Sequence, residues 1–353
     1  MTDSLPNDQI SCPLPLPHQQ VIVMGHGSGG KMTHDLIKKT FYKALGNPIL
    51  LSKDDAANIG ITEGCKLAVS IDSHVVFPLF FPGGDIGRLA VCGTVNDVSM
   101  LGAVPMYLTA GFILEEGLEV SILEKVLASM RVAAQEAGVY IVAGDTKVVQ
   151  KGKADGLYIS TCGIGKIPPG IEISGLCAQP GDVVILSGTI GDHGIAVLEA
   201  RNELGFTSGI KSDVAPLNHL VEAILSTGST IHVLRDPTRG GLATTLNEIA
   251  SQSQVCITLN ESSIPVTSEV MAVCELLGYD PLYVPNEGKI IVILPEQFAC
   301  DVFTKMQNTP YGERSAIIGR VIDAPKGRVL MKTSLGTTRI VDMLSGEMLP
   351  RIC

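Results

Sequence analysis

Apolar runs that end in an aspartate constrain the fold of this chain more than any other feature. "KLAVSID" ends at Asp72, "VYIVAGDTK" carries Asp145 near its end, and Asp236 follows the apolar run "IHVLR" directly. Short apolar runs that are rich in Val and Ile and are bounded by turn residues are typical of buried strands. We therefore predict an α/β protein. If its strands share one edge of an open sheet, their acidic ends will lie together there.

Helical patterns and one proline-rich stretch divide the chain. Apolar residues recur at helical spacing over 32–45 and 86–103, between the predicted strands. "PPGIEISGLCAQPGD" is rich in proline and glycine and marks a domain boundary near residue 170. The expected organisation is therefore a flexible arm, an N-terminal domain, a C-terminal α/β domain and a mobile tail, with the bounds 1–20, 21–168, 169–341 and 342–353.

Composition excludes several classes of protein. The formal net charge of -10 argues against a basic face that binds nucleic acid. No basic segment followed by an apolar core opens the chain, and no apolar run is long enough to span a bilayer. The nine cysteines are odd in number and form no C-x-x-C pair, which argues against a zinc ribbon or a disulfide framework. A reduced, cytoplasmic setting is expected.

A glycine loop, "GHGSGGKM" at 25–32, follows a predicted strand at 21–24 and precedes a helix. It nearly fits the phosphate-binding pattern G-x-x-x-x-G-K-[ST], except that Met32 replaces the hydroxyl residue that binds magnesium. Backbone amides that converge at a helix start attract an anion. The pattern fits a phosphate site or a tight turn about equally well. The candidate residues are Gly25, Gly27, Gly29, Gly30 and Lys31.

Acidic residues are the second group of candidates. Several carboxylates at one sheet edge repel each other unless a cation neutralises them, and magnesium takes oxygen ligands and bridges to phosphates. Each acid alone is explained as well by a turn or a helix cap. Together with the glycine loop they favour metal–nucleotide binding. The set is the pair Asp54 and Asp55, with Asp72, Asp97, Asp145 and Asp236.

Other candidates carry two interpretations each. Lys147, two residues after Asp145, either reaches a phosphate or is a surface lysine. Glu287 in "PNEGK" is either a base or a loop acid, and Arg239 either clamps a phosphate or caps a turn. Cys353, the last residue, is either an accident of position or a thiol presented to an active site on a movable segment.

These segments together resemble one family. "GHGSGG", "FFPGGDIG", "GTVNDVSMLGA", "AGDTKVV", "SGTIGDHG", "RDPTRGGL", "NEGK" and "PRIC" are similar to segments of the HypE family of hydrogenase maturation proteins. "DDAA", "NDVSMLGA" and "GDT", which includes Thr146, are shared more widely with ATP-using relatives such as aminoimidazole ribonucleotide synthetase. The resemblance implies two α/β domains, a homodimer whose N-terminal strands form a barrel, and ATP bound near the domain junction. It also implies that Mg²⁺ is held by five aspartates: Asp55, with Asp54 as an alternative, Asp72, Asp97, Asp145 and Asp236.

The resemblance also gives the candidates roles. It implies that a HypF-type carbamoyltransferase loads Cys353 with a carbamoyl group, which ATP-dependent dehydration converts to a thiocyanate. The cyanide then passes to iron on a HypC–HypD-type complex. Lys147 would stabilise the phosphoryl transfer and Glu287 would act as the base. Two alternatives remain: a kinase or synthetase that acts on a free small molecule, for which Cys353 has no role, and a non-catalytic carrier that consumes no ATP.

Overall fold

The computed structural model describes residues 29–36, 38, 51, 54, 57–60, 66–201 and 208–346. The predicted strand at 21–24 and the candidates Gly25, Gly27, Asp55 and Cys353 lie outside these residues. So does most of the predicted helix at 32–45, of which α1 (Lys31–Leu36) is described.

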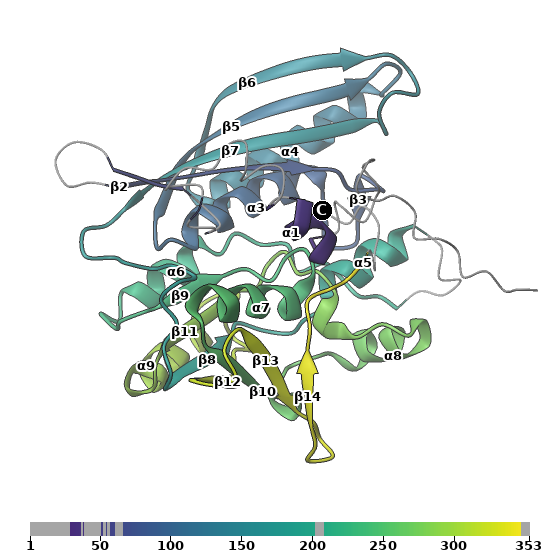
Figure 1. Cartoon of the computed structure of the whole chain (residues 1–353). Helices are drawn as coiled ribbons and strands as arrows, with labels where there is room; N and C mark the ends of the chain where they lie inside the picture. Colours follow the sequence, from purple (N-terminus) through teal and green to yellow (C-terminus); the bar gives the residue numbers. More distant parts are fainter. Residues whose placement is uncertain are drawn as a thin grey trace, which may run out of the picture.

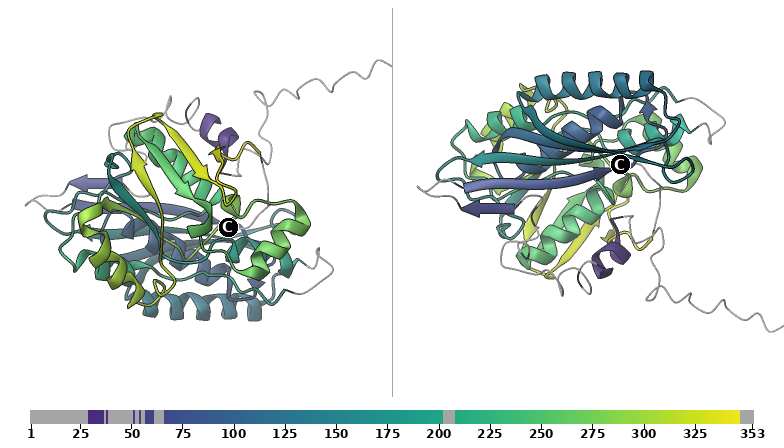
Figure 2. Two further views of the ribbon diagram at one scale, coloured as in Figure 1. Left: turned by 90° about the horizontal axis from the view of Figure 1, so that it is seen from below. Right: turned by 90° about the horizontal axis from the view of Figure 1, so that it is seen from above.

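A five-stranded sheet forms the N-terminal half, in the order β1-β2-β7-β5-β6. Only the β5–β6 pair is parallel. Two helices, α3 (Ile86–Ser99) and α4 (Val120–Ala137), pack on the face of this sheet that is turned toward the rest of the chain, and no helix of the described residues lies on the opposite face (Figures 1 and 2). The strands are β1 (Ala57–Gly60), β2 (Lys66–His74), β5 (Val104–Glu115), β6 (Tyr140–Val149) and β7 (Leu157–Ile167).

Helix α3 is the central element of this half. Asp85 caps its start by accepting hydrogen bonds from the amides of Gly87 and Arg88, at 2.7 and 3.2 Å. Side chains such as Leu89, Val91 and Val95 are fully buried, so the helix is apolar on most sides and lies between the sheet and its neighbours. The helix predicted at 86–103 is confirmed, but it ends four residues earlier, at Ser99.

A seven-stranded sheet forms the C-terminal half, in the order β14-β13-β10-β12-β8-β11-β9. Its core includes Val184, Leu186, Ile291 and Ile293, and α7 (Gly241–Ser253) packs against β13. On the other side α9 (Glu296–Gln307) contacts β8 and β11. The strands are β8 (Asp182–Leu186), β9 (Val233–Arg235), β10 (Cys256–Asn260), β11 (Ile291–Pro295), β12 (Ala316–Ile322), β13 (Arg328–Lys332) and β14 (Thr338–Val341).

Shorter elements join the two halves. The FFPGGD segment makes a small hairpin from β3 and β4, and helices α5, α6 and α8 and two 3₁₀ turns complete the described chain. Their bounds are β3 (Phe80–Phe81), β4 (Gly84–Asp85), α5 (Asp192–Ala200), α6 (Asn218–Leu225), α8 (Ser268–Leu277), η4 (Glu261–Ser263) and η5 (Pro281–Tyr283). Among the described residues, no helix combines the length and apolar character that a bilayer crossing requires.

The prediction that the acids end their strands and share one sheet edge is wrong in two cases. Asp72 lies within β2, where it pairs with Thr161 of β7, and Asp145 lies in the middle of β6. Polar residues after each acid continue the strand because their backbones still have a hydrogen-bonding neighbour in the ladder. Both sheets are mixed, so they have no common carboxyl edge. Asp236, directly after β9, does follow its strand as predicted.

Candidate active site at the junction of the two halves

Carboxylates from both halves gather above α3. An added Cβ at Gly93 would lie 3.7 Å from Asp72 Oδ2 and 3.9 Å from Glu287 Oε2, so both carboxylates border one point on this helix. Asp236, which is 7% exposed, joins them through its charge. We call Asp72, Asp236 and Glu287 the acid cluster. It combines a strand of the N-terminal sheet with two loops of the C-terminal half.

Burial and mutual repulsion mark the acid cluster. Burial first, and then the charges of Asp72, Asp236 and Asp213, raise the pKa of Glu287 well above 4.5. The pKa of Asp236 rises to about 6, again through burial first and the charge of Asp72, although Arg235 opposes the shift. Groups this strongly shifted and close together are typical of a functional site. The cluster would gain from any cation bound beside it.

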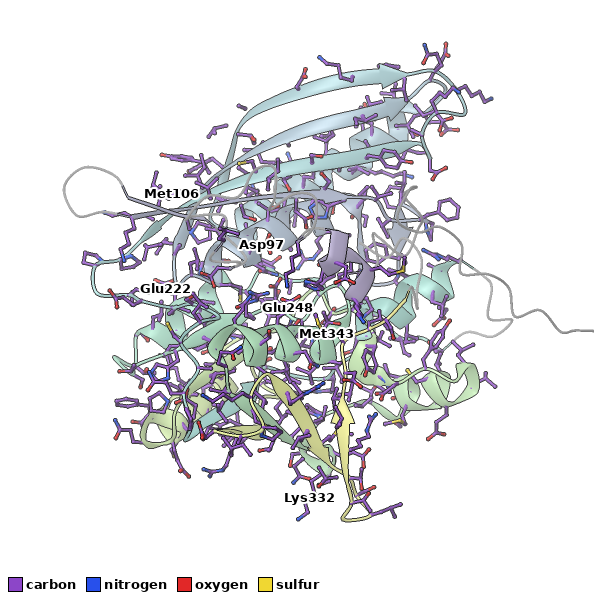
Figure 3. All side chains as sticks on the ribbon, viewed as in Figure 1. Asp97, Met106, Glu222, Glu248, Lys332 and Met343 are labelled. Carbon is purple, nitrogen blue, oxygen red and sulfur yellow. The ribbon has the colours of Figure 1, made fainter. Side chains whose placement is uncertain are left out.

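The fourth acid, Asp97, faces the same junction from α3. Its Oδ2 accepts a hydrogen bond of 2.7 Å from the hydroxyl of Ser70 on β2. Figure 3 shows Asp97 at the helix layer of the N-terminal half and Glu248 on α7 of the other half. Asp97 therefore borders the junction, as the sequence predicts.

The glycine segment 29–31 lies against two other candidate segments. Gly29 packs on Arg239, because a Cβ added there would come within 2.7 Å of Arg239 Cβ. The amide of Lys31 donates a 2.5 Å hydrogen bond to the carbonyl of Leu344, and a Cβ added at Gly30 would overlap that same carbonyl. The glycine segment thus holds the start of the tail, residues 342–353, beside the loop that carries Asp236.

A partly buried chain of ion pairs joins α1 to the C-terminal half. His34 of α1 contacts Glu248 of α7 at 2.8 Å, and Glu248 contacts Arg235 at 2.5 Å. The hydrogen bond to Glu248 raises the pKa of His34, although burial opposes the shift. Arg235 directly precedes Asp236, so the chain ties α1 to the loop of the acid cluster.

Asp145, Thr146 and Lys147 lie elsewhere. Asp145 pairs with Gly111, Gly111 with Ser160 and Ser160 with Ser73, so Asp145 points to the same face of the sheet as Ser73. Asp72 points to the opposite face, because neighbouring residues of a strand alternate. Within one chain, the structure therefore does not bring Asp145 or Lys147 to the acid cluster. This corrects the predicted convergence of the acids.

Asp145 and Lys147 are both exposed on the face of the sheet that carries Ser73. Asp145 contacts Lys147 at 2.9 Å, and their side chains are 69% and 72% exposed. The hydrogen bond from Lys147, followed by that from the amide of Thr146, lowers the pKa of Asp145. These residues are solvent-facing in a single chain.

Known families match both halves of the chain. The model for the N-terminal domain of AIR synthase related proteins matches residues 53–167, and the model for their C-terminal domain matches residues 179–332. The carbamoyl dehydratase HypE of Cupriavidus necator is 52% identical over 332 residues, which cover 94% of this chain and 95% of that protein.

The chain belongs to the HypE family.

Solved HypE structures agree. A HypE crystal structure in complex with ATP has a TM-score of 0.79 at 52% identity and covers 94% of this chain and 100% of that one. HypE in a HypE–HypF complex has a TM-score of 0.83 at 50% identity and covers 88% and 99%. The α/β class and the AIR synthase-like fold predicted from the sequence are thereby confirmed, as is the family resemblance.

The donor set of this HypE-family chain fits magnesium in one particular mode. Among the described residues, no three acidic, histidine or cysteine side chains are placed around a single point for a metal. Magnesium usually binds through one or two carboxylates, several waters and the phosphates of its substrate. The negative charge of the acid cluster suits a magnesium ion that is bound partly by substrate phosphates and waters, and it does not suit an ion coordinated by protein side chains alone. Asp54 has other partners, because the hydroxyl of Ser174 and the amide of Gly175 donate to its carboxylate at 3.0 and 2.9 Å.

Sequence reasoning missed several polar residues of the junction. His74, which is 1% exposed, lies beside Asp72, and burial lowers its pKa. Asp213 forms a 3.0 Å ion pair with Lys289, and Asn96 contacts the loop of Glu287. Asn96 and Lys289 lie within the family segments "NDVSMLGA" and "NEGK", which were the only sequence signals that could have found them.

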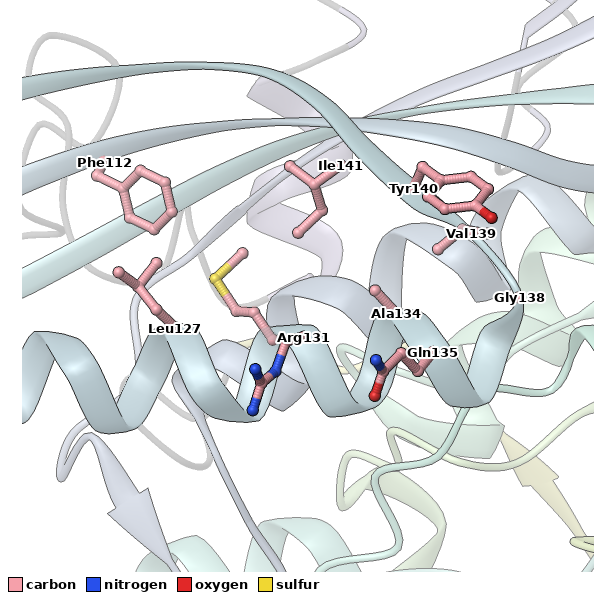
Figure 4. A pocket seen from close by; sticks show the side chains of 10 residues that line it. Phe112, Leu127, Arg131, Ala134, Gln135, Gly138, Val139, Tyr140 and Ile141 are labelled. Atoms are coloured by element: carbon pink, nitrogen blue, oxygen red, sulfur yellow. The ribbon is translucent and has the colours of Figure 1, made fainter.

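The cavity between α4 and β6 is a separate feature. It has a volume of about 530 Å³ and is lined mainly by apolar side chains such as Phe112, Leu127 and Ile141 (Figure 4). None of the predicted site residues lines it. We therefore place the candidate active site at the acid cluster.

Proposed function

We propose that this chain uses ATP to dehydrate an S-carbamoyl group on Cys353 to a thiocyanate, the source of cyanide in nickel–iron hydrogenase maturation. The observation that carries the proposal is the hydrogen bond between Lys31 and Leu344, which holds the start of the tail beside the acid cluster. HypE relatives that bear the name carbamoyl dehydratase support it over nearly the whole chain.

The tail is long enough to bring Cys353 to this site. Cys353 is the ninth residue after Leu344, and nine residues of extended chain span at most ~32 Å. A thiol tethered in this way has an effective concentration on the order of millimolar at the site, so tight binding is unnecessary. The same tether lets the thiol leave its own site for a partner.

ATP is the proposed phosphoryl donor. The glycine loop, with Gly25, Gly27, Gly29, Gly30 and Lys31, would hold its phosphates. Asp55, Asp72, Asp97 and Asp236 would hold Mg²⁺, which supplies charge neutralisation for the phosphates when bound. The HypE structure with ATP supports nucleotide binding, and the raised pKa of Asp236 supports a cation beside that carboxylate.

The reaction divides into two balanced steps. The carbamoyl oxygen attacks the γ-phosphorus of ATP, ADP leaves, and the nitrogen loses one of its two protons to solvent, so that an O-phosphorylated imidate forms, with its carbon still bonded to the sulfur. A base then removes the remaining proton from the nitrogen, the C–O bond breaks, and phosphate leaves as the nitrile forms. Lys147 would stabilise negative charge in the first step, and Glu287 would take the proton in the second. The raised pKa of Glu287 makes its carboxylate a stronger base than an exposed glutamate.

We propose a homodimer, which the position of Lys147 supports. The face of the N-terminal sheet on which no described helix lies exposes Ile71, Tyr107 and Ile113 by 73%, 44% and 42%. An apolar sheet face of this kind needs a cover, and a second copy supplies one by strand pairing in the predicted barrel. We propose that Asp145 and Lys147, with Thr146 between them on the strand, act in the site of the partner copy, because the side chains of Asp145 and Lys147 lie across the sheet from the acid cluster of their own chain.

Two further partners are proposed. A HypF-type carbamoyltransferase would load Cys353, which the HypE–HypF crystal structure supports for a relative. A HypC–HypD-type complex would accept the cyanide. It is proposed from the family resemblance.

Intact mass of the tail peptide tests the function. After loading by a HypF-type enzyme, ATP should remove the mass of one water from the Cys353 peptide while ADP and phosphate form. A kinase or synthetase would turn over ATP and a small molecule with the tail deleted. A carrier would show no magnesium-dependent ATP consumption. Either result would replace the proposed function.

A further inference from the structure

The backbone N–H and the backbone carbonyl of Glu287 are each hydrogen-bonded to a buried side chain from outside the loop of Glu287. Its N–H donates to Asp213 Oδ1 at 3.0 Å. Its carbonyl accepts a longer hydrogen bond, of 3.4 Å, from Asn96 Nδ2. Asn96 is 1% exposed, and the side chain of Asp213 is 4% exposed. Water therefore does not compete for these contacts, and the backbone of Glu287 is fixed in place.

Asn96 joins three segments at the junction. Besides Glu287, its Nδ2 donates to the carbonyl of Ala215 at 3.0 Å, and its Oδ1 accepts from the amide of Leu217 at 2.7 Å. Asn96 belongs to α3, whereas its partners belong to the C-terminal half. The side chain of Asn96, which directly precedes Asp97, thus fixes the loop of Glu287 relative to α3.

Asp213 supports the same loop from the other side. Its second oxygen, Oδ2, forms the 3.0 Å ion pair with Lys289, whose side chain is 12% exposed. Gly288 lies so close that an added Cβ would overlap the carbonyl oxygen of Asp213. The loop around Glu287 is therefore seated directly on the main chain at residue 213.

We infer that Asn96 and Asp213 are positioning residues, which aim the carboxylate of Glu287 at the carbamoyl nitrogen. This inference rests on the proposed role of Glu287 as the base. A base acts only within hydrogen-bond reach of the proton that it removes, and such groups need support to within ~0.5 Å. A misplacement of ~1 Å costs on the order of a hundredfold in rate. The nucleotide and its phosphoryl step depend on other residues.

Single-turnover assays on S-carbamoyl-Cys353 protein, with partner and ATP, separate the two steps. Asn96→Ala should slow thiocyanate formation by about ten- to a hundredfold, while ADP formation changes little. Asn218→Ala is the matched control, because Asn218 also bridges the two halves, through a 2.9 Å bond to the carbonyl of Ala137. The control should leave both steps unchanged.

A pair of variants at Asp213 tests the hydrogen bond itself. Asp213→Asn keeps an oxygen acceptor for the amide of Glu287, whereas Asp213→Ala removes it. Positioning predicts that the asparagine variant retains more of the elimination rate than the alanine variant. This pair decides the matter if Asn96→Ala does not fold.

Two outcomes overturn the inference. If the Asn96 and Asp213 variants slow ADP and thiocyanate formation equally, and lose ATP affinity as well, these residues are merely structural. If the variants eliminate phosphate at the same rate as the protein without substitutions, Asn96 and Asp213 do not position Glu287. Glu287→Gln, measured in the same assay, distinguishes failure of the proposed base from failure of the inference. If this variant forms thiocyanate at the normal rate, Glu287 is not the base and the inference fails with it. If Glu287→Gln forms thiocyanate slowly while the Asn96 and Asp213 variants form it at the normal rate, only the inference fails.

Discussion

At the scale of single residues, the buried Glu287 and the partly buried Glu248 show how the surroundings of a glutamate decide its role. Glu287 lies among other acids, and burial together with their charges raises its pKa. Glu248 lies between His34 and Arg235, whose hydrogen bond and charge hold its pKa below the usual value even though burial opposes this. The first is suited to take a proton and the second to hold two helices together.

Opposite effects on stability should follow from these shifts. A glutamate with a raised folded-state pKa costs stability as the pH rises above its ordinary value of 4.5. Glu287→Gln should therefore raise the melting temperature of the nucleotide-free protein at neutral pH, by about 2 °C or more, and this gain should shrink toward pH 4.5. Glu248→Gln should lower the melting temperature at neutral pH. Thermal unfolding measured across pH checks both signs, and a loss of stability in Glu287→Gln would contradict the burial of an uncompensated charge.

Lys147 should act on a different step from Glu287. Removing a preorganised cation from the phosphoryl transfer typically costs about a hundredfold or more. In single turnover, Lys147→Ala should form little ADP, whereas Glu287→Gln should form ADP and accumulate or hydrolyse the phosphorylated intermediate. Lys166→Ala, a change at another exposed strand lysine, is the control and should behave like the unmodified protein. Equal loss of ADP formation in the Lys147 and Glu287 variants would place Glu287 in substrate alignment.

The sequence predicted the chemistry-bearing residues better than the residues that support them. Asp72, Asp97, Asp236 and Glu287 stand in recognisable segments, and the structure brings them to one junction. Asp213 lies in none of these segments. Asn96 does lie in one, but its supporting contact, like that of Asp213, is to the backbone of Glu287, more than 70 residues away, which a local pattern does not predict.

At the scale of elements, the strands were predictable and their register was not. Apolar periodicity located β2, β6 and β7, but it carried no information on which strand pairs with which. The mixed order β1-β2-β7-β5-β6 depends on long-range hydrogen bonds. For that reason the sequence placed Asp145 beside Asp72, whereas the ladder turns the two side chains to opposite faces of the sheet.

The contact between the glycine segment and the tail gives a prediction at this scale. A methyl group at Gly30 would overlap the carbonyl of Leu344. Gly30→Ala should therefore displace the tail and slow dehydration of the tethered carbamoyl group by about tenfold or more, the effect of a misplacement approaching 1 Å. Gly346→Ala is the matched control, because open space surrounds that position. Tail-peptide mass against time measures both, and equal rates would show that this contact does not seat the tail.

At the scale of the whole molecule, the central proposal is that two copies of the chain share each site. The chain has a mass of 37.2 kDa, and sedimentation should show twice that value. In dimers that combine a Lys147→Ala copy with a Glu287→Gln copy, action across the interface leaves one site with both defects and one with neither. Such mixed dimers should regain about half of the normal turnover. Mixed dimers as inactive as either parent would place Lys147 in its own chain's site.

One measurement tests the central claim most directly. The carbamoyl group on Cys353 is loaded with a heavy-oxygen label at its carbonyl, and a single turnover with unlabelled ATP is followed by mass spectrometry of the products. Because the carbamoyl oxygen attacks phosphorus and leaves with it, the account predicts that the label appears in inorganic phosphate as the tail peptide becomes thiocyanate. Label released into water, with unlabelled phosphate, would contradict it.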